Sequence, residues 1–133
     1  MAEAPVELLR GIPLFAELKD REVKAVAGAM TQRRVDTGQT LAVEGTQGIG
    51  FFVIESGTAK VTVDGQERRV LGPGDYFGEI ALIVDTPRTA TVTAETPVVS
   101  WAIASWAFRP IVQENASVAW RLLDTLAKML AQR

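Results

Sequence analysis

The spacing of hydrophobic residues predicts helices at both ends of the chain. Near the N-terminus, the apolar stretch 6–15 is interrupted by Gly11 and Pro13, which predicts one short helix followed by a turn. Asp20 is the predicted N-cap of a second helix that ends near Thr31. Hydrophobic side chains recur behind this cap at helical spacing: Val23, Val26, Ala27 and Met30.

A similar pattern occupies the last thirty residues. One predicted helix face carries Ala119, Leu122, Leu123, Leu126 and Leu130. Pro110 cannot donate a backbone hydrogen bond, so the preceding helix is expected to start late or to kink there. The indole side chains are expected to lie in the core or where these helices dock: Trp101, Trp106 and Trp120.

Between the helical parts, from Arg33 to about Ala104, the pattern is that of short strands separated by glycines. Odd positions are apolar within 58–63, and their side chains are expected to face inward: Ala59, Val61 and Val63. The uniformly apolar run 51–54 predicts a buried strand. The order of elements predicts an α+β fold, in which an antiparallel sandwich or barrel is flanked by N-terminal and C-terminal helices.

Composition narrows the function. A chain of 133 residues with 47% hydrophobic residues predicts a single domain. Lys and Arg number 14 against 16 Asp and Glu, a balance that argues against a nucleic-acid surface or a polybasic membrane anchor. With no Cys and no His, only oxygen ligands remain for a metal, and we expect no metal site and no catalytic residues. No signal peptide or spanning run is evident, so a cytoplasmic protein is expected.

Two charged residues stand out in an otherwise apolar stretch, where unpaired charges would be costly. Glu79 follows Phe77-Gly78, and Arg88 lies nine residues later, after Pro87. A guanidinium suits a phosphate, and a helical turn beginning at Gly78 would aim backbone N–H groups at the same anion. A carboxylate beside a phosphate is repulsive unless it binds a hydroxyl. The alternative is that Glu79 and Arg88 form an internal salt bridge over a turn.

The run 77–92 resembles the phosphate-binding cassette of cyclic nucleotide-binding domains. That cassette reads Phe-Gly-Glu, a small and a large apolar residue, a spacer, then Pro-Arg and a small residue before Ala-Thr-Val. The resemblance implies a jelly-roll barrel of the double-stranded β-helix type over 33–104, with N-terminal helices over 1–32 and C-terminal helices over 105–133. All of these parts belong to one domain, 1–133.

The same resemblance implies roles for individual residues. Glu79 accepts a hydrogen bond from the ribose 2′-hydroxyl, and Arg88 holds the phosphate. Gly78 permits close approach of the backbone, which completes the cradle at Ile80, Ala81, Thr89 and Ala90. Val61 contributes to an apolar wall for the ribose and base.

The resemblance further implies a sensor of cAMP or cGMP that is not an enzyme, in which the ligand moves the C-terminal helix over the base. Thr89 does not indicate which nucleotide is bound, because a hydroxyl at this position occurs in family members that prefer cGMP and also in several that prefer cAMP. We favour cAMP from the compact type of domain rather than from any residue. The effector and a homodimer stay open. Two alternatives remain: a degenerate domain that serves as a protein-interaction module, and the sensor piece of a catabolite-activator-like regulator without its DNA-binding domain.

Overall fold

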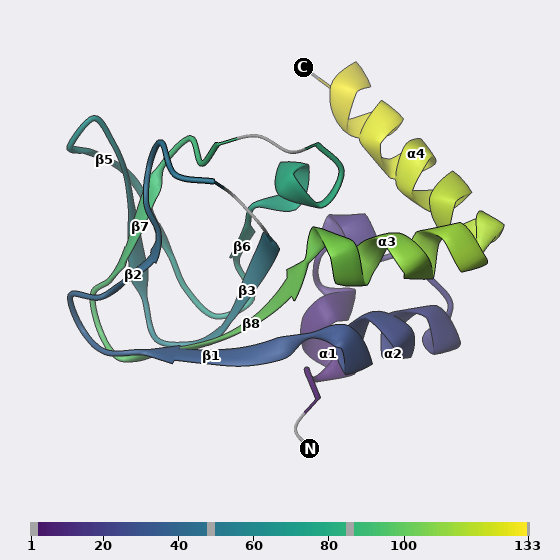
Figure 1. Ribbon diagram of the computed structural model, residues 1–133, viewed down its shortest axis with the longest axis horizontal. Coiled ribbons are helices and arrows are strands. Elements are labelled where there is room, and N and C mark those ends of the chain that lie inside the picture. Colours follow the sequence, from purple (N-terminus) through teal and green to yellow (C-terminus); the bar gives the residue numbers. More distant parts are fainter. Residues whose placement is uncertain (1–2, 48–49, 85–86, 133) are drawn as a thin grey trace.

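The computed structural model places two β-sheets face to face, with the helices packed at one side of the sandwich (Figure 1). It describes residues 3–47, 50–84 and 87–132; for Glu79 and Ile80 it describes the backbone alone. Within these ranges each sheet has four strands, and every strand pairing is antiparallel. The predicted fold class is therefore confirmed.

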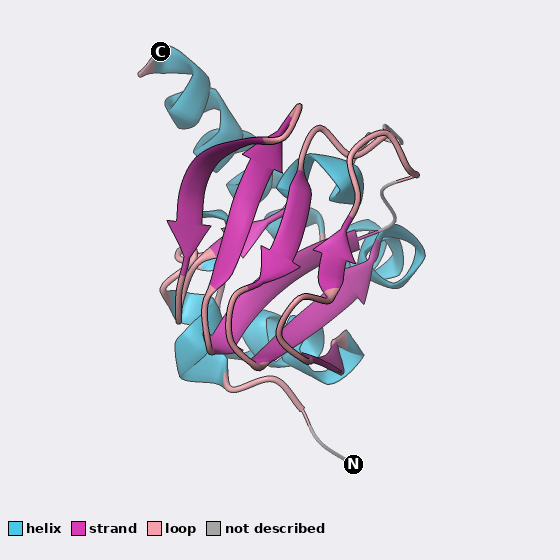
Figure 2. Cartoon of the chain, turned by 90° about the vertical axis from the view of Figure 1, so that its left-hand side faces the viewer, coloured by secondary structure: helices cyan, strands magenta, loops and turns pink. Residues whose placement is uncertain are grey.

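The first sheet has the order β1-β8-β3-β6, and the second has the order β2-β7-β4-β5. The strands of the first sheet are β1 (Thr31–Val35), β8 (Val98–Ala104), β3 (Gly50–Ser56) and β6 (Tyr76–Phe77). Those of the second are β2 (Thr40–Ala42), β7 (Thr91–Ala94), β4 (Ala59–Val63) and β5 (Gln66–Leu71). Figure 2 looks onto the face of the second sheet, with the first sheet behind it.

Strand β3 explains why residues 51–54 lack polar alternation. Phe51 and Val53 pack in a core cluster shared with the helices, whereas Phe52 and Ile54 pack in the cluster between the two sheets. Both faces of the strand are thus buried, as predicted, and a strand buried on both faces reads as a continuous apolar run. The Phe51 ring meets Phe15 edge to face at 5.5 Å.

The hairpin between β4 and β5 agrees with its sequence signal. Asp64 and Gly65 have positive φ values of 51° and 79°, the backbone that a tight two-residue hairpin turn needs. Ala59 and Val61 are buried in the sandwich, as expected, and Val63 at the end of the strand is half-buried.

Four α-helices and two 3-10 helices complete the described chain. They are α1 (Val6–Arg10), η1 (Pro13–Phe15), α2 (Asp20–Ala29), η2 (Glu79–Leu82), α3 (Ser105–Glu114) and α4 (Ala116–Ala131). Asp20 is the first residue of α2, and Lys19 is its N-cap, so the predicted cap was one residue late. None of the described helices is long and apolar enough to cross a membrane.

The C-terminal helices depart in part from the expectations. Helix α3 begins directly after β8 and contains Pro110, so it does not start late, and a kink at Pro110 stays a prediction. The buried side chain of Phe108, whose ring lies 6.3 Å from that of Phe15, holds the helix against the core despite the missing donor. Trp101 is buried as predicted, but Trp106 and Trp120 are 65% and 71% exposed.

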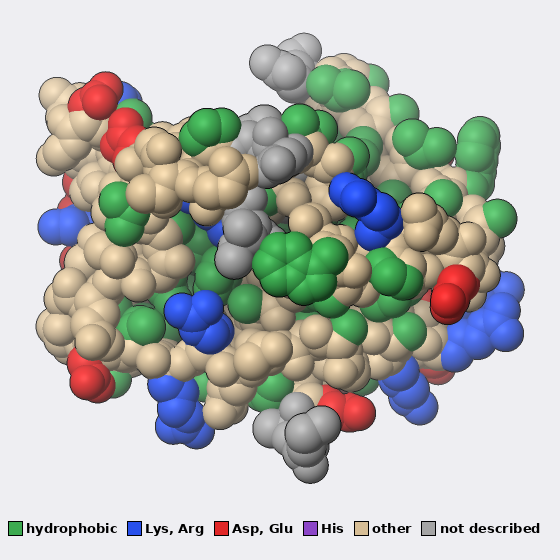
Figure 3. All heavy atoms as spheres, in the orientation of Figure 1, with side chains coloured by type: hydrophobic (Ala, Val, Ile, Leu, Met, Phe, Trp, Pro, Cys, Tyr) green, Lys and Arg blue, Asp and Glu red, His purple; other side chains and the backbone are tan. Residues whose placement is uncertain are grey.

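Helix α4 carries two apolar stripes instead of one. Val118 and Leu122 are buried against the helical core, but Leu123 and Leu130, placed on the same face by sequence, are 60% and 63% exposed. Together with Trp120 these two leucines form an outer stripe, because residues three and ten positions apart lie on similar sides of a helix. Figure 3 shows hydrophobic side chains gathered along this helix at the upper right.

Candidate functional site

A cavity of about 180 Å³ opens between the second sheet and the segment around η2. Eleven residues line it: Ala42, Val61, Arg69, Phe77, Gly78, Ala81, Pro87, Arg88, Thr89, Ala90 and Val92. Most of them are apolar or small, and two are arginines. Such a cavity suits a ligand with an anionic group and a flat apolar part. No group of three or more potential metal ligands occurs among the described residues.

The structure brings six of the eight sequence-predicted site residues to this cavity: Val61, Gly78, Ala81, Arg88, Thr89 and Ala90. The other two, Glu79 and Ile80, begin η2 directly after Gly78. Their side chains lie outside the described part of the structure. The hydrogen bond expected from a hydroxyl to Glu79, and the alternative salt bridge between Glu79 and Arg88, therefore both stay predictions.

Arg88 is fixed at the edge of the cavity by its side chain. Its Nη2 donates a hydrogen bond of 2.7 Å to the carbonyl oxygen of Gly50, at the start of β3. The guanidinium carbon lies 5.7 Å from the ring centroid of Phe52 and 5.8 Å from that of Phe77. These two rings are stacked at 4.9 Å and form an aromatic support for the cation.

Burial also changes the electrostatics of Arg88. The side chain is half-buried, and desolvation lowers its pKa from the ordinary value of an arginine, because burial disfavours the charged form. An anion in the cavity would offset that cost through charge-assisted hydrogen bonds. The site is therefore suited to a phosphate group.

The position of Arg88 leaves no room for a side chain at residue 78, which is a glycine. Its φ is +89°, a conformation that L side chains rarely adopt, and an ideal Cβ would lie 2.5 Å from Arg88 Nη1 and 2.6 Å from the Gly50 oxygen. The glycine thus allows the start of η2, the guanidinium and β3 to meet. The sequence indicated close approach to a ligand at this position; the structure adds close approach to the arginine itself.

The backbone of Arg88 is held by the loop between β2 and β3. Its N–H donates to the Thr46 carbonyl at 2.7 Å, and its own carbonyl accepts from the Gly45 N–H at 2.9 Å. Sequence reasoning missed these two hydrogen bonds. The contact joins segments about forty residues apart, so no local pattern could indicate it.

Arg69 is a lining residue that sequence reasoning also missed. It lies in β5 directly opposite Val61 of β4, and residues paired across strands present their side chains to the same face. The Asp64-Gly65 turn alone would place Arg68 opposite Val61, and a register shift between Val61 and Thr62 brings Arg69 there instead, so the sequence held no usable signal for Arg69. Two positively charged side chains, those of Arg69 and Arg88, therefore line the same cavity, although they come from different parts of the fold.

Comparison with known proteins assigns the family. The model of the cyclic nucleotide-binding domain matches residues 32–115, and the chain belongs to this family. It is 31% identical over 115 residues to a cAMP-dependent protein kinase regulatory subunit of Yarrowia lipolytica, covering 86% of this chain and 31% of the relative. It is 36% identical over 97 residues to a cGMP-dependent protein kinase of Eimeria tenella, covering 73% of this chain and 10% of the relative. The chain thus spans less than a third of either relative.

A solved structure agrees in fold over nearly the whole chain. The N-terminal domain of a transcriptional regulator from Streptomyces coelicolor A3(2) superposes with a TM-score of 0.86 at 34% identity. The match covers 94% of this chain and 93% of that one. The helices that precede and follow the sandwich in the sequence are therefore part of the shared fold, and the chain is a cyclic nucleotide-binding regulatory domain.

Proposed function

We propose that the cavity binds a cyclic nucleotide through its phosphate, with Arg88 as the principal anion-binding group. One observation carries this proposal: a half-buried guanidinium, supported by Gly50, Phe52 and Phe77, borders a cavity of about 180 Å³. The singly charged phosphodiester of a cyclic nucleotide would offset the desolvation of the cation. Backbone N–H groups at Ile80, Ala81, Thr89 and Ala90 are proposed to complete the cradle, with Gly78 leaving room for the approach.

The ribose and base occupy the rest of the cavity in this proposal. By resemblance to the family, Glu79 accepts a hydrogen bond from the ribose 2′-hydroxyl. Val61, which is buried and lines the cavity, supplies an apolar wall. The requirement for a hydroxyl distinguishes this mode from a general phosphate site, because a bare phosphate would be repelled by the carboxylate.

The compact type of domain favours cAMP, whereas Arg69 favours cGMP, the second candidate. Guanine presents two neighbouring acceptors, O6 and N7, that a guanidinium can meet with two hydrogen bonds. Adenine presents an amino donor in place of O6, and this donor cannot accept from an arginine. Thr89 lines the same cavity and offers a hydroxyl near the phosphate end. The relatives include both a cAMP-dependent and a cGMP-dependent kinase system, so the names of the relatives favour neither nucleotide.

The proposed output is a movement of α4 and not a chemical reaction. The outer stripe of α4 is exposed, and so are Ile83 and Val84 just after η2, at 52% and 50%. Burial of these apolar surfaces against one another would favour an arrangement in which α4 lies nearer the nucleotide. The sequence left a homodimer and the effector open, and the two alternative interpretations, an interaction module and a fragment of a transcription regulator, stay predictions.

Calorimetric titration of the intact chain with cAMP, cGMP and 2′-deoxy-cAMP tests the proposal. We expect binding of a 3′,5′-cyclic nucleotide and at least a tenfold loss of affinity without the 2′-hydroxyl, in keeping with the loss of a hydrogen bond to a charged group. Absence of binding by all three would overturn the proposal and favour the interaction-module alternative. Equal binding of cAMP and its 2′-deoxy analogue would overturn the role of Glu79.

A further inference from the structure

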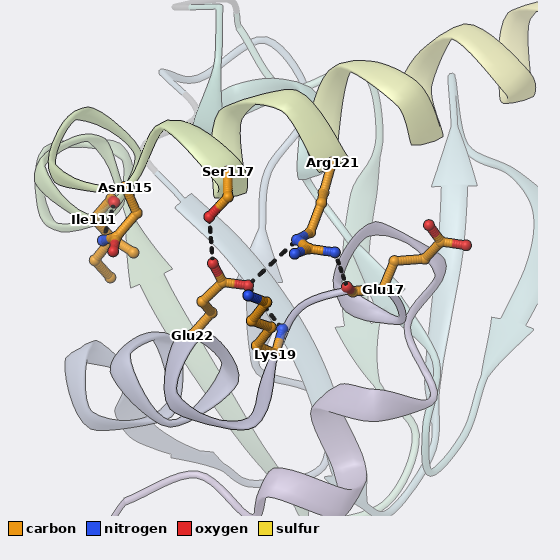
Figure 4. A network of polar contacts seen from close by, with 7 residues as sticks. All are labelled: Glu17, Lys19, Glu22, Ile111, Asn115, Ser117 and Arg121. Carbon is orange, nitrogen blue, oxygen red and sulfur yellow. Dashed lines mark hydrogen bonds and ion pairs between the residues drawn. The ribbon is translucent and has the colours of Figure 1, made fainter.

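A buried carboxylate joins the two ends of the chain at a distance from the nucleotide cavity. Glu22 of α2 is 2% exposed, and none of the residues that line the cavity contacts it in the described hydrogen bonds and ion pairs. Figure 4 shows its carboxylate between α2 and the first turns of α4. A buried charge is retained only where partners compensate for its desolvation.

Three partners meet the carboxylate of Glu22. Its Oε1 accepts the backbone N–H of Lys19 at 2.7 Å, which satisfies a free donor at the start of α2. Its Oε2 accepts the Ser117 hydroxyl at 2.8 Å, and Arg121 Nε lies 3.5 Å from Oε1 as an ion pair. Arg121 Nη1 also donates to the Glu17 carbonyl at 3.2 Å (Figure 4). Two residues of α4 are thereby tied to the segment 17–22.

The polar ties and the fully buried contacts lie at the beginning of α4, and further along the helix the half-buried Leu126 also packs against the helical core. The polar ties come from Ser117 and Arg121, and the buried apolar contacts come from Val118 and Leu122. Leu123 and Leu130 are mostly exposed. Figures 1 and 2 both show the C-terminal half of α4 extending beyond the rest of the molecule. The beginning of the helix is therefore held by more contacts than its last turns.

The ion pair is also incompletely satisfied. Arg121 Nε is buried and has no hydrogen-bond partner among the described atoms, and its 3.5 Å contact with Glu22 is longer than an ordinary N–H···O hydrogen bond. A buried donor without a partner costs free energy, so this junction is held less tightly than its number of contacts suggests. A modest gain of interaction free energy at another site could therefore break this junction.

We propose that Glu22, Ser117 and Arg121 form a latch that fixes the first two turns of α4 to the N-terminal helices and opposes the movement of α4 toward the nucleotide. Glu22 is a positioning residue in this role, since it acts through α4. The claim that the latch opposes the movement of α4 rests on the proposed function, in which the outer stripe of α4 becomes covered when nucleotide is bound. A movement that carries the first turns of α4 away from α2 would have to break the contacts to Glu22.

Amide exchange of the full chain without nucleotide tests the latch itself. In the wild type we expect stronger protection over 116–122 than over 123–131. Glu22→Gln should lower protection over 116–122 roughly tenfold to a hundredfold, as expected for the loss of hydrogen bonds to a charged group. Asp20→Asn is the matched control, because Asp20 lies on the same helix but pairs with Arg10 and leaves α4 untouched. Unchanged exchange in Glu22→Gln would overturn the latch.

Nucleotide titration of the same proteins tests the coupling. Glu22→Gln and Ser117→Ala should bind cAMP or cGMP roughly fivefold or more tightly than the wild type, whereas Asp20→Asn should not. Ser117→Ala removes one hydrogen bond from an exposed residue and keeps the test valid if Glu22→Gln does not fold. Equal or weaker binding by both variants, with α4 loosened, would overturn the opposing role. Failure of every protein to bind would overturn the proposed function, while the exchange result would still decide the latch.

Discussion

Gly78 lies so close to Arg88 that a methyl group on the glycine would lie 2.5 Å from the guanidinium Nη1. The cassette glycine and the cassette arginine are thus one structural unit, although nine residues separate them in sequence. Replacing the glycine should displace the arginine without removing its charge. Such a variant tests whether binding depends on the position of the guanidinium and not only on its charge.

We expect Gly78→Ala to weaken nucleotide binding at least tenfold and to lower the free energy of unfolding by about 1–3 kcal/mol, because of the clash and the left-handed backbone. The control is Gly38→Ala, since Gly38 has a similar φ of +87° but nothing within 4 Å of its ideal Cβ. Urea denaturation and calorimetric titration measure the two effects. If both variants bind equally well, the contact between Gly78 and Arg88 does not position the cation.

The stability of the protein should depend on pH through Glu22. Burial alone would raise the pKa of this carboxyl group, but hydrogen bonds from Lys19 and Ser117, with the charges of Arg121 and Lys19, together hold its pKa below the ordinary value. A lowered pKa means that the carboxylate stabilises the fold above the ordinary pKa of a glutamate. That contribution is lost as the pH falls through the lower, folded-state pKa.

Glu22→Gln should therefore lower the free energy of unfolding at pH 7 by about 1.5–3 kcal/mol. The difference from the wild type should shrink as the pH falls below about 4, because the wild-type carboxyl group is then increasingly neutral as well. Urea denaturation of both proteins between pH 7 and 3 measures this, and other carboxylates cancel in the comparison. A difference that is constant across this range would show that the charge of Glu22 is not what stabilises the junction.

Arg69 should influence which base is bound. We expect Arg69→Ala to weaken cGMP binding by about 1–3 kcal/mol, the worth of a bidentate contact to guanine, with a smaller effect on cAMP. The neighbouring Arg68→Ala is the control, because Arg68 is also exposed on β5 but does not line the cavity. A parallel loss for both nucleotides would assign Arg69 a general electrostatic role instead of a role in base recognition.

The outer stripe of α4 should contribute to binding if the helix moves over the nucleotide. We expect the double variant Leu123→Ser and Leu130→Ser to bind the cyclic nucleotide several-fold more weakly, because less apolar surface would become buried. Trp106→Ser is the control, being an exposed aromatic residue of α3 outside the stripe. Light scattering on the same samples measures the oligomeric state. A loss of dimer without a loss of affinity would assign the stripe to self-association.

Local sequence patterns predicted the parts of the fold that depend on local physics. Alternation placed Ala59 and Val61 in the sandwich, and the cassette run brought Gly78 and Arg88 to one cavity. The Gly50 carbonyl that accepts from Arg88 is thirty-eight residues away along the chain. It could not be predicted, because this contact depends on the relative positions of η2, β3 and the cassette and not on any periodicity.

For the helices, too, the sequence predicted local features but not the contacts between distant segments. Hydrophobicity predicted that α4 is amphipathic, but residue type alone could not tell which of two neighbouring leucines is covered, and Leu122 is buried while Leu123 is exposed. Trp120 was expected to be buried for the same reason. The buried Glu22 resembled an ordinary polar position of α2, because its partners Ser117 and Arg121 come from the other end of the chain.

The central claim is that Arg88 binds the phosphate of a cyclic nucleotide, and titration calorimetry of Arg88→Ala tests it most directly. We expect a loss of about 2–5 kcal/mol of binding free energy for the tighter of cAMP and cGMP, as for truncation of one half of a buried charged pair. Arg88→Lys should recover only part of this loss, because an ammonium cannot reproduce the two parallel hydrogen bonds of a guanidinium. Arg34→Ala, an exposed arginine outside the cavity, should bind as the wild type does. Unchanged affinity in a folded Arg88→Ala protein would contradict the account.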